Sequence, residues 1–124
     1  MSGDSAILGG AALCDVVLSG ASYSEFRFFV FGTGANLGDA VAPSAGADVD
    51  GVTRHRATAY VACPGRPVRV ETSVAGGNLA AGDTLETDNV GRAVKRSTGV
   101  AVARALEAST STGTIIWAVW SSGR

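Results

Sequence analysis

The sequence predicts an all-β protein, a small β-barrel or sandwich of short antiparallel strands with an extended N-terminal arm. Turn-forming residues recur about every 8–12 positions, the spacing of strands in small barrels and sandwiches. Several segments between these turns alternate apolar and polar side chains, as half-buried strands do. The 17 glycines argue against long helices, because glycine weakens a helix by about 1 kcal/mol relative to alanine.

The 124 residues fit one domain, which we expect at residues 25–124, preceded by an arm at residues 1–24. The arm is rich in Gly, Ala and Ser, and one short strand is expected near its end, at residues 15–18. Four glycines disfavour a helix in the arm: Gly3, Gly9, Gly10 and Gly20. Ordering such a segment costs backbone entropy of about 1–2 kcal/mol per residue, so we expect the arm to order against a partner.

The first strand is expected at residues 25–31, with the sequence EFRFFVF. Its alternation places Phe28 on one face and both Phe29 and Phe31 on the other, so both faces are largely apolar. A strand with two apolar faces lies either in the centre of a sandwich or barrel or beneath another subunit. Phe29 and Phe31 are therefore candidate interface residues.

Turn residues and alternation predict the later strands. They are expected, in chain order, at residues 40–42, within 52–62 and best at 57–61, and at 68–73, 84–87, 92–96, 99–107 and 115–120. Residues 88–91, DNVG, predict a hairpin with a type I turn and a bulge, because Asp, Asn and Gly suit that turn.

Metal-binding side chains are scarce, since the chain has one His, two Cys, four Glu and seven Asp. Cys14 and Cys63 have no CxxC partner or second ligand nearby in sequence, so both are expected as free thiols. The DVDG run at residues 48–51 lacks the later carboxylate ligands of a calcium loop, so a solvated turn is expected. We expect no metal and no cofactor.

No catalytic grouping is visible either. His55 lies between two arginines, without a nucleophile or an orienting acid nearby in sequence, which favours a surface position over a general base. The GTGANLG run at residues 32–38 precedes no helix, and Asp39 after it would repel a phosphate. We expect no catalytic residue and no enzyme.

Charge and hydropathy exclude two kinds of partner. The formal net charge is −1, and no basic run is longer than residues 54–56, which argues against a nucleic-acid partner. No stretch approaches the roughly 20 apolar residues that span a bilayer. The apolar segment at residues 7–18 follows Asp4 and no basic residue, so it does not fit a signal peptide. We expect a soluble chain without a membrane partner.

The C-terminal strand carries a second interface signal. Trp117 and Trp120 are three residues apart, so on a strand they face opposite sides, and one can be in the core while the other is exposed. An exposed tryptophan usually marks an interface. The interface candidates, with the apolar residues of the arm as anchors, are Ile7, Leu8, Leu13, Val16, Val17, Phe29, Phe31, Trp117 and Trp120.

Residues 64–120 resemble the small capsid cement or decoration proteins of tailed bacteriophages. The shared pattern is an early PG with a strand, then GD.L..D..G, a short strand, G.A..AL and a final apolar strand. The matching residues are Gly82, Asp83, Leu85, Asp88, Gly91, Gly99, Ala105 and Leu106.

The resemblance implies a β-rich virion protein on the outer capsid surface. Such proteins bind the major capsid protein as homotrimers and clamp neighbouring capsomers, without catalysis or a cofactor. Two alternatives stay open on the residues alone. One is a head fibre or receptor-binding module, and the other is a small β-barrel enzyme or ligand-binding protein.

Overall fold

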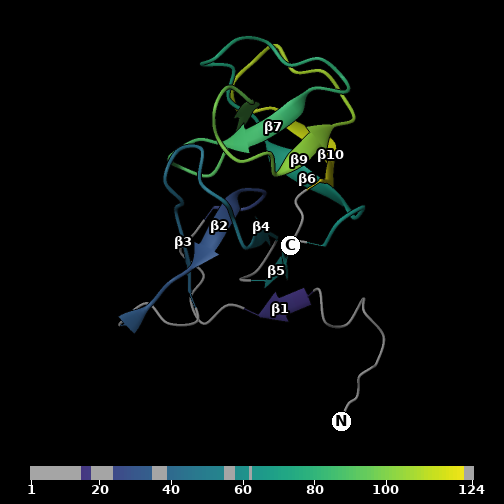
Figure 1. Ribbon diagram of the computed structural model, residues 1–124. Coiled ribbons are helices and arrows are strands. Elements are labelled where there is room, and N and C mark those ends of the chain that lie inside the picture. The colour runs from purple at the N-terminus through teal and green to yellow at the C-terminus, as the bar shows by residue number, and fades with distance from the viewer. Residues whose placement is uncertain (1–14, 18–23, 35–38, 55–57, 62, 122–124) are drawn as a thin grey trace.

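The computed structural model describes residues 15–17, 24–34, 39–54, 58–61 and 63–121. It confirms the all-β class, because the described residues form ten short strands in two five-stranded antiparallel sheets. The sheets are open and stacked as a sandwich, so the sandwich is correct and the closed barrel is not (Figure 1). Each sheet comes from one half of the chain. No helix in the described part is long and apolar enough to cross a membrane.

The N-terminal half forms the lower sheet of Figure 1, with strand order β1-β5-β4-β2-β3. Its strands are β1 (Asp15–Val17), β2 (Phe28–Phe31), β3 (Ala40–Val41), β4 (Gly51–Thr53) and β5 (Thr58–Val61). The expected strand near residues 15–18 is confirmed as β1, which pairs with β5 and forms one edge of the sheet. That end of the predicted arm is therefore part of the sheet.

Two predictions in this half need correction. The strand expected at residues 25–31 begins only at Phe28, because Phe26 adopts a φ of 61°, in the left-handed region that strands do not use. The single strand expected within residues 52–62 is two strands, β4 and β5. All three residues of β4 are buried, so it shows no alternation that would reveal it.

The C-terminal half forms the upper sheet, with strand order β6-β10-β9-β7-β8. Its strands are β6 (Pro67–Glu71), β7 (Thr84–Thr87), β8 (Ala93–Lys95), β9 (Ala103–Ala105) and β10 (Ile115–Trp120). The predicted hairpin is confirmed, because β7 pairs with β8 across the turn and Gly91 adopts the positive φ that the bulge requires. The strand expected at residues 99–107 is shorter, since Val100 bonds to the carbonyl of Gly46 in the other half.

One apolar core lies between the two sheets. In β6, alternation buries Val68 and Val70 and leaves Arg69 exposed, while in β10 it buries Trp120 against the ring of Phe28 from β2, at 5.8 Å between centroids. The buried members of the core are Phe28, Val49, Val52, Val68, Val70, Leu79, Leu85, Ala93, Val102, Ala103, Ala105, Ile116, Ala118 and Trp120. Both halves contribute to this core, so they fold as one unit.

Polar contacts also join the two sheets. Arg27, just before β2, forms a two-pronged ion pair with Glu71 at the end of β6, with both nitrogen–oxygen distances at 3.2 Å. Elsewhere the backbones of Gly46 and Gly99 approach so closely that a Cβ on Gly99 would lie 2.4 Å from the Gly46 Cα. These contacts fix how the two sheets sit on each other, and thereby shape the pocket between them.

Candidate binding site

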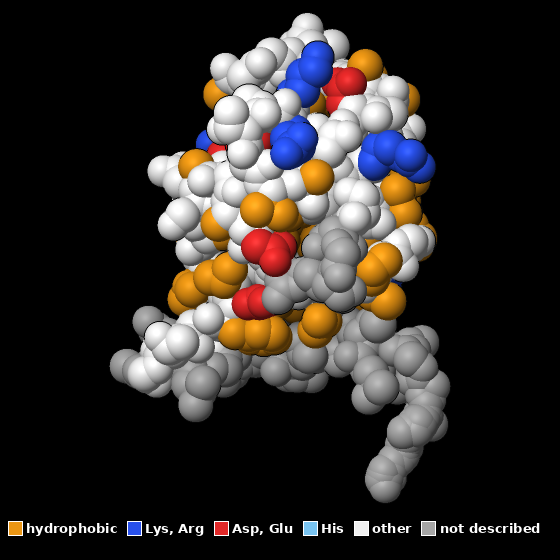
Figure 2. Space-filling view, viewed as in Figure 1, with side chains coloured by type: hydrophobic (Ala, Val, Ile, Leu, Met, Phe, Trp, Pro, Cys, Tyr) orange, Lys and Arg blue, Asp and Glu red, His pale blue; other side chains and the backbone are white. Residues whose placement is uncertain are grey.

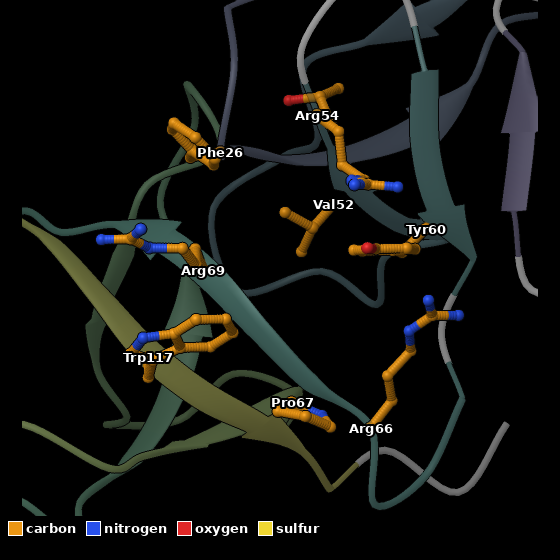
Figure 3. Close-up of a pocket in the computed structure, with 9 residues that line it drawn as sticks. Phe26, Val52, Arg54, Tyr60, Arg66, Pro67, Arg69 and Trp117 are labelled. Carbon is orange, nitrogen blue, oxygen red and sulfur yellow. The ribbon is translucent and has the colours of Figure 1, made fainter.

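A pocket of about 470 Å³ lies at the junction of the two sheets. The lower sheet contributes β4 and β5, and the upper sheet contributes β6 and β10, so the pocket exists only when both halves are folded together (Figure 3). The lining residues are Phe26, Val52, Thr53, Arg54, Tyr60, Arg66, Pro67, Arg69 and Trp117.

One wall of the pocket is a stack of two arginines on a tyrosine. The ring of Tyr60, on β5, lies between the guanidinium groups of Arg54 and Arg66, whose central carbons are 4.0 Å and 3.6 Å from the ring centroid (Figure 3). A guanidinium over an aromatic face is attracted by the ring's negative face. The tyrosine therefore holds two positive charges close to each other at the pocket.

The opposite wall is a cross-strand pair. Trp117 of β10 lies directly opposite Arg69 of β6, and the guanidinium of Arg69 is 5.2 Å from the indole ring. Both side chains point away from the core, because their neighbours along each strand are buried. Trp117 is 43% exposed, so a large apolar surface faces solvent at the rim.

The backbone at Phe26 joins the two walls. Its N–H donates to the carbonyl of Thr53 in the lower sheet, and its carbonyl accepts from the N–H of Glu71 in the upper sheet. These bonds hold Phe26 in its left-handed conformation, which costs free energy for a bulky residue. The Thr53 hydroxyl donates to the carbonyl of Ser24, at 2.6 Å. The edge of the pocket is thus firmly held from both sides.

The pocket is positively charged. Its described lining holds three arginines and no Asp or Glu. Neither Arg54 nor Arg69 forms an ion pair with any residue in the described part of the chain. Nearby, Arg27 is neutralised by Glu71. Guanidinium groups bind carboxylates and phosphates through paired hydrogen bonds, so this arrangement suits an anionic group.

The structure separates the interface candidates of the sequence into three groups. Trp117 lines the pocket, and Phe31 is 38% exposed at the end of β2. Phe29 and Trp120 are only 0% and 2% exposed within the single chain, so the reason for expecting a partner over them no longer holds. Ile7, Leu8 and Leu13 lie outside the described residues, while Val16 and Val17 are placed in β1 by their backbone alone.

The remaining residues that the sequence drew attention to either make contacts within the fold or lie outside the described residues. Asp50 of the DVDG run accepts a hydrogen bond from the N–H of Phe31, at 2.8 Å, and Asp48 accepts one from the next residue. Cys63 is half-buried. His55 and Cys14 lie outside the described residues. Within the described residues, no three His, Cys, Asp or Glu side chains are grouped to hold a metal ion.

No motif in the sequence marks Tyr60 and the three arginines of the pocket as site residues. Alternation does predict that Arg69 faces away from the core and that Trp117 and Trp120 face opposite sides, but the pairing of Arg69 with Trp117 depends on the register between β6 and β10. Arg54 and Tyr60 come together through the pairing of β4 with β5, and Arg66 reaches them through the packing of the two sheets, for which short-range sequence patterns carry no signal. The position of these residues beside one another depends on tertiary structure.

The comparisons with known proteins concern the fold. No family model and no curated protein matches the chain. Among solved structures, it shares its fold with the base of a phage head fibre. The structure concerned is that of the head fiber gp8.5 N base in bacteriophage phi29, with a TM-score of 0.61, 17% sequence identity and coverage of 87% of each chain. At this identity the similarity establishes a common fold.

Proposed function

We propose that this chain is a structural protein of a bacteriophage virion that attaches to the outer surface of the head, with the major capsid protein as its partner. The observation that carries the proposal is the shared fold with the base of the phi29 head fiber, which covers 87% of both chains. The resemblance of residues 64–120 to capsid decoration proteins supports the same location from the sequence. The role is structural and involves neither catalysis nor nucleic acid.

Exposed apolar side chains support attachment to another protein. Among the described residues, four large apolar side chains are more than a third exposed: Phe31, Val100, Leu106 and Trp117. On the face shown in Figure 2, hydrophobic side chains gather over the lower sheet, whereas Lys and Arg lie over the upper sheet. Apolar surface of this kind is stabilised when a partner covers it. On a head of repeated subunits, we propose that three copies assemble together as a homotrimer.

Two finer roles fit this location. In the first, the chain is a cement protein that clamps neighbouring capsomers, a role favoured by the turn and strand pattern around Gly82 to Leu106. In the second, it is the base of a head fibre, a role favoured by the shared fold. Heating distinguishes them. A cement protein should raise the temperature at which filled heads release DNA, and a fibre base should leave it unchanged.

Co-sedimentation with heads tests the proposal. The purified chain is mixed with expanded heads or with unexpanded procapsids of the phage that encodes it, and the pellets are analysed after centrifugation. We expect the chain to pellet in fixed stoichiometry with expanded heads and not with procapsids, because expansion of the shell changes its outer surface. A chain that stays in the supernatant with both particles would contradict the proposal.

A further inference from the structure

The described lining of the pocket between the sheets carries positive charge and no negative charge. Arg54 and Arg66 stack on opposite faces of Tyr60, and Arg69 lies across the pocket over Trp117 (Figure 3). Like charges held this close repel one another. The described lining contains no carboxylate, and neither Arg54 nor Arg69 forms an ion pair with a described residue. A bound anion would remove this repulsion and gain charge-assisted hydrogen bonds.

We propose that this pocket binds an acidic segment of a partner protein, through one or more of its Asp or Glu carboxylates. The placement of that partner on the phage head rests on the proposed function above. The planar guanidinium groups of Arg54 and Arg69 match a carboxylate through two parallel hydrogen bonds. The aromatic faces of Tyr60 and Trp117 accept the apolar stems of the same segment.

The size and rim of the pocket suit a peptide segment. A volume of about 470 Å³ is that of a small-ligand site, which holds a few side chains and not a folded domain. Beside the pocket, Leu106 is 48% exposed, and its N–H donates to the carbonyl of Trp117 at 2.9 Å. Leu106 and Trp117 therefore form an apolar rim against which the rest of the segment can pack.

A nucleic acid fits this surface poorly. A carboxylate oxygen of Glu107 accepts the backbone N–H of Trp117 at 2.8 Å, beside the pocket. A phosphate backbone that crossed the pocket toward Trp117 would meet this carboxylate. The chain as a whole carries a formal charge of −1, so it offers no long-range attraction to a polyanion. A short acidic segment, unlike a longer phosphate backbone, can contact the arginines without reaching a carboxylate.

Tryptophan fluorescence tests the inference without any phage particle. Trp117 is exposed at the pocket and Trp120, the other tryptophan of the chain, is buried, so a ligand in the pocket should change the Trp117 emission. The probe is a capped hexaglutamate peptide, compared with capped hexaglutamine and with inorganic phosphate. We expect saturable binding of hexaglutamate that weakens as salt is raised, no response to hexaglutamine, and binding of phosphate about tenfold weaker.

Matched variants locate the binding. Arg54→Gln and Arg69→Gln, singly and together, should each weaken hexaglutamate binding about tenfold or more. Arg104→Gln is the control, because Arg104 is exposed on β9 and lies outside the pocket. The single variants change exposed side chains, and a thermal melt confirms that each is folded. No response to hexaglutamate, equal binding of phosphate, or an equal loss in Arg104→Gln would overturn the inference.

Co-sedimentation with the same variants separates this inference from the proposed function. If the wild-type chain pellets with expanded heads and the Arg54→Gln/Arg69→Gln variant does not, the pocket is the contact with the head. If both pellet equally, the chain is a head protein but the pocket is not its contact, and the inference is wrong. If the wild type does not pellet, the proposed function fails, and the peptide titration alone decides whether the pocket binds carboxylates.

Discussion

At the scale of single residues, Gly99 shows how closely the two halves of the chain approach. A Cβ at this position would lie 2.4 Å from the Cα and 2.8 Å from the carbonyl oxygen of Gly46, and backbone atoms have little freedom to move away. We predict that Gly99→Ala lowers the free energy of unfolding by about 1–3 kcal/mol, as overpacking does. Urea denaturation followed by circular dichroism measures this change.

Gly76→Ala is the control for that prediction. Nothing lies within 4 Å of a Cβ at Gly76, and its φ is outside the left-handed region. The substitution should leave the stability unchanged or raise it by up to about 1 kcal/mol, because alanine has less freedom in the unfolded chain. Equal destabilisation by both substitutions would contradict the close approach of Gly46 and Gly99.

Trp120 combines dense packing with an unsatisfied donor. It is 2% exposed and packs on Phe28, yet its indole Nε1 has no hydrogen-bond partner among the described atoms. We predict that Trp120→Ala costs about 3–5 kcal/mol of stability, because it opens a cavity. Trp120→Phe should cost less than about 1.5 kcal/mol, since removing the unpaired N–H offsets part of the lost volume. Similar losses in the two variants, measured by urea denaturation, would argue against this account.

At the scale of elements, the ion pair of Arg27 and Glu71 ties the start of β2 to the end of β6. The side chains are 24% and 18% exposed, so solvent screens the pair only in part. We predict that Glu71→Gln lowers the free energy of unfolding by about 1–2 kcal/mol. A double-mutant cycle with Arg27→Gln should show a coupling of similar size.

The pair of Lys95 and Asp83 serves as the matched comparison. Its nitrogen–oxygen distance is 3.9 Å and Lys95 is about half exposed, so the water around it weakens the attraction. The same cycle at this pair should give a coupling below about 0.5 kcal/mol. A coupling at Arg27 and Glu71 no larger than this would show that the pair does not hold the sheets together.

The predicted arm ends in an element of the sheet. Since β1 pairs with β5, deletion of residues 2–18 leaves the outer edge of β5 without its partner strand, whereas deletion of residues 2–14 keeps β1. We predict that both truncated proteins stay folded, with a lower melting temperature for the longer deletion, and that removal of residues 2–18 abolishes binding to heads. Circular dichroism melts and co-sedimentation measure the two effects. Unchanged affinity for heads after that deletion would show that the arm is not a binding element.

The elements differ in how well the sequence predicted them. Strand β6 was predicted because Val68 and Val70 alternate with polar residues, and β10 because turn residues precede its apolar run. Strand β4 was missed because it is short and buried at every position. The break before β2 depends on Phe26, whose left-handed conformation is imposed by hydrogen bonds to both sheets. Local patterns cannot report a conformation that distant residues enforce.

At the scale of the whole molecule, the candidate site is a product of sheet packing. The sequence predicted an exposed tryptophan in the last strand, and Trp117 is that residue. It could not predict that Tyr60 and its two arginines would face Trp117, because these residues come from different sheets and meet only at the junction. The candidate site therefore exists only where the two sheets pack together.

Imaging of decorated heads tests the central claim most directly. Expanded heads of the phage that encodes the chain are reconstructed by electron cryo-microscopy, with and without the added protein. Attachment to the head predicts extra density on the outer capsid surface, at three-fold positions, into which the two-sheet domain fits as a trimer. Identical maps for the two samples, or added density confined to the inside of the shell, would contradict a head-surface protein.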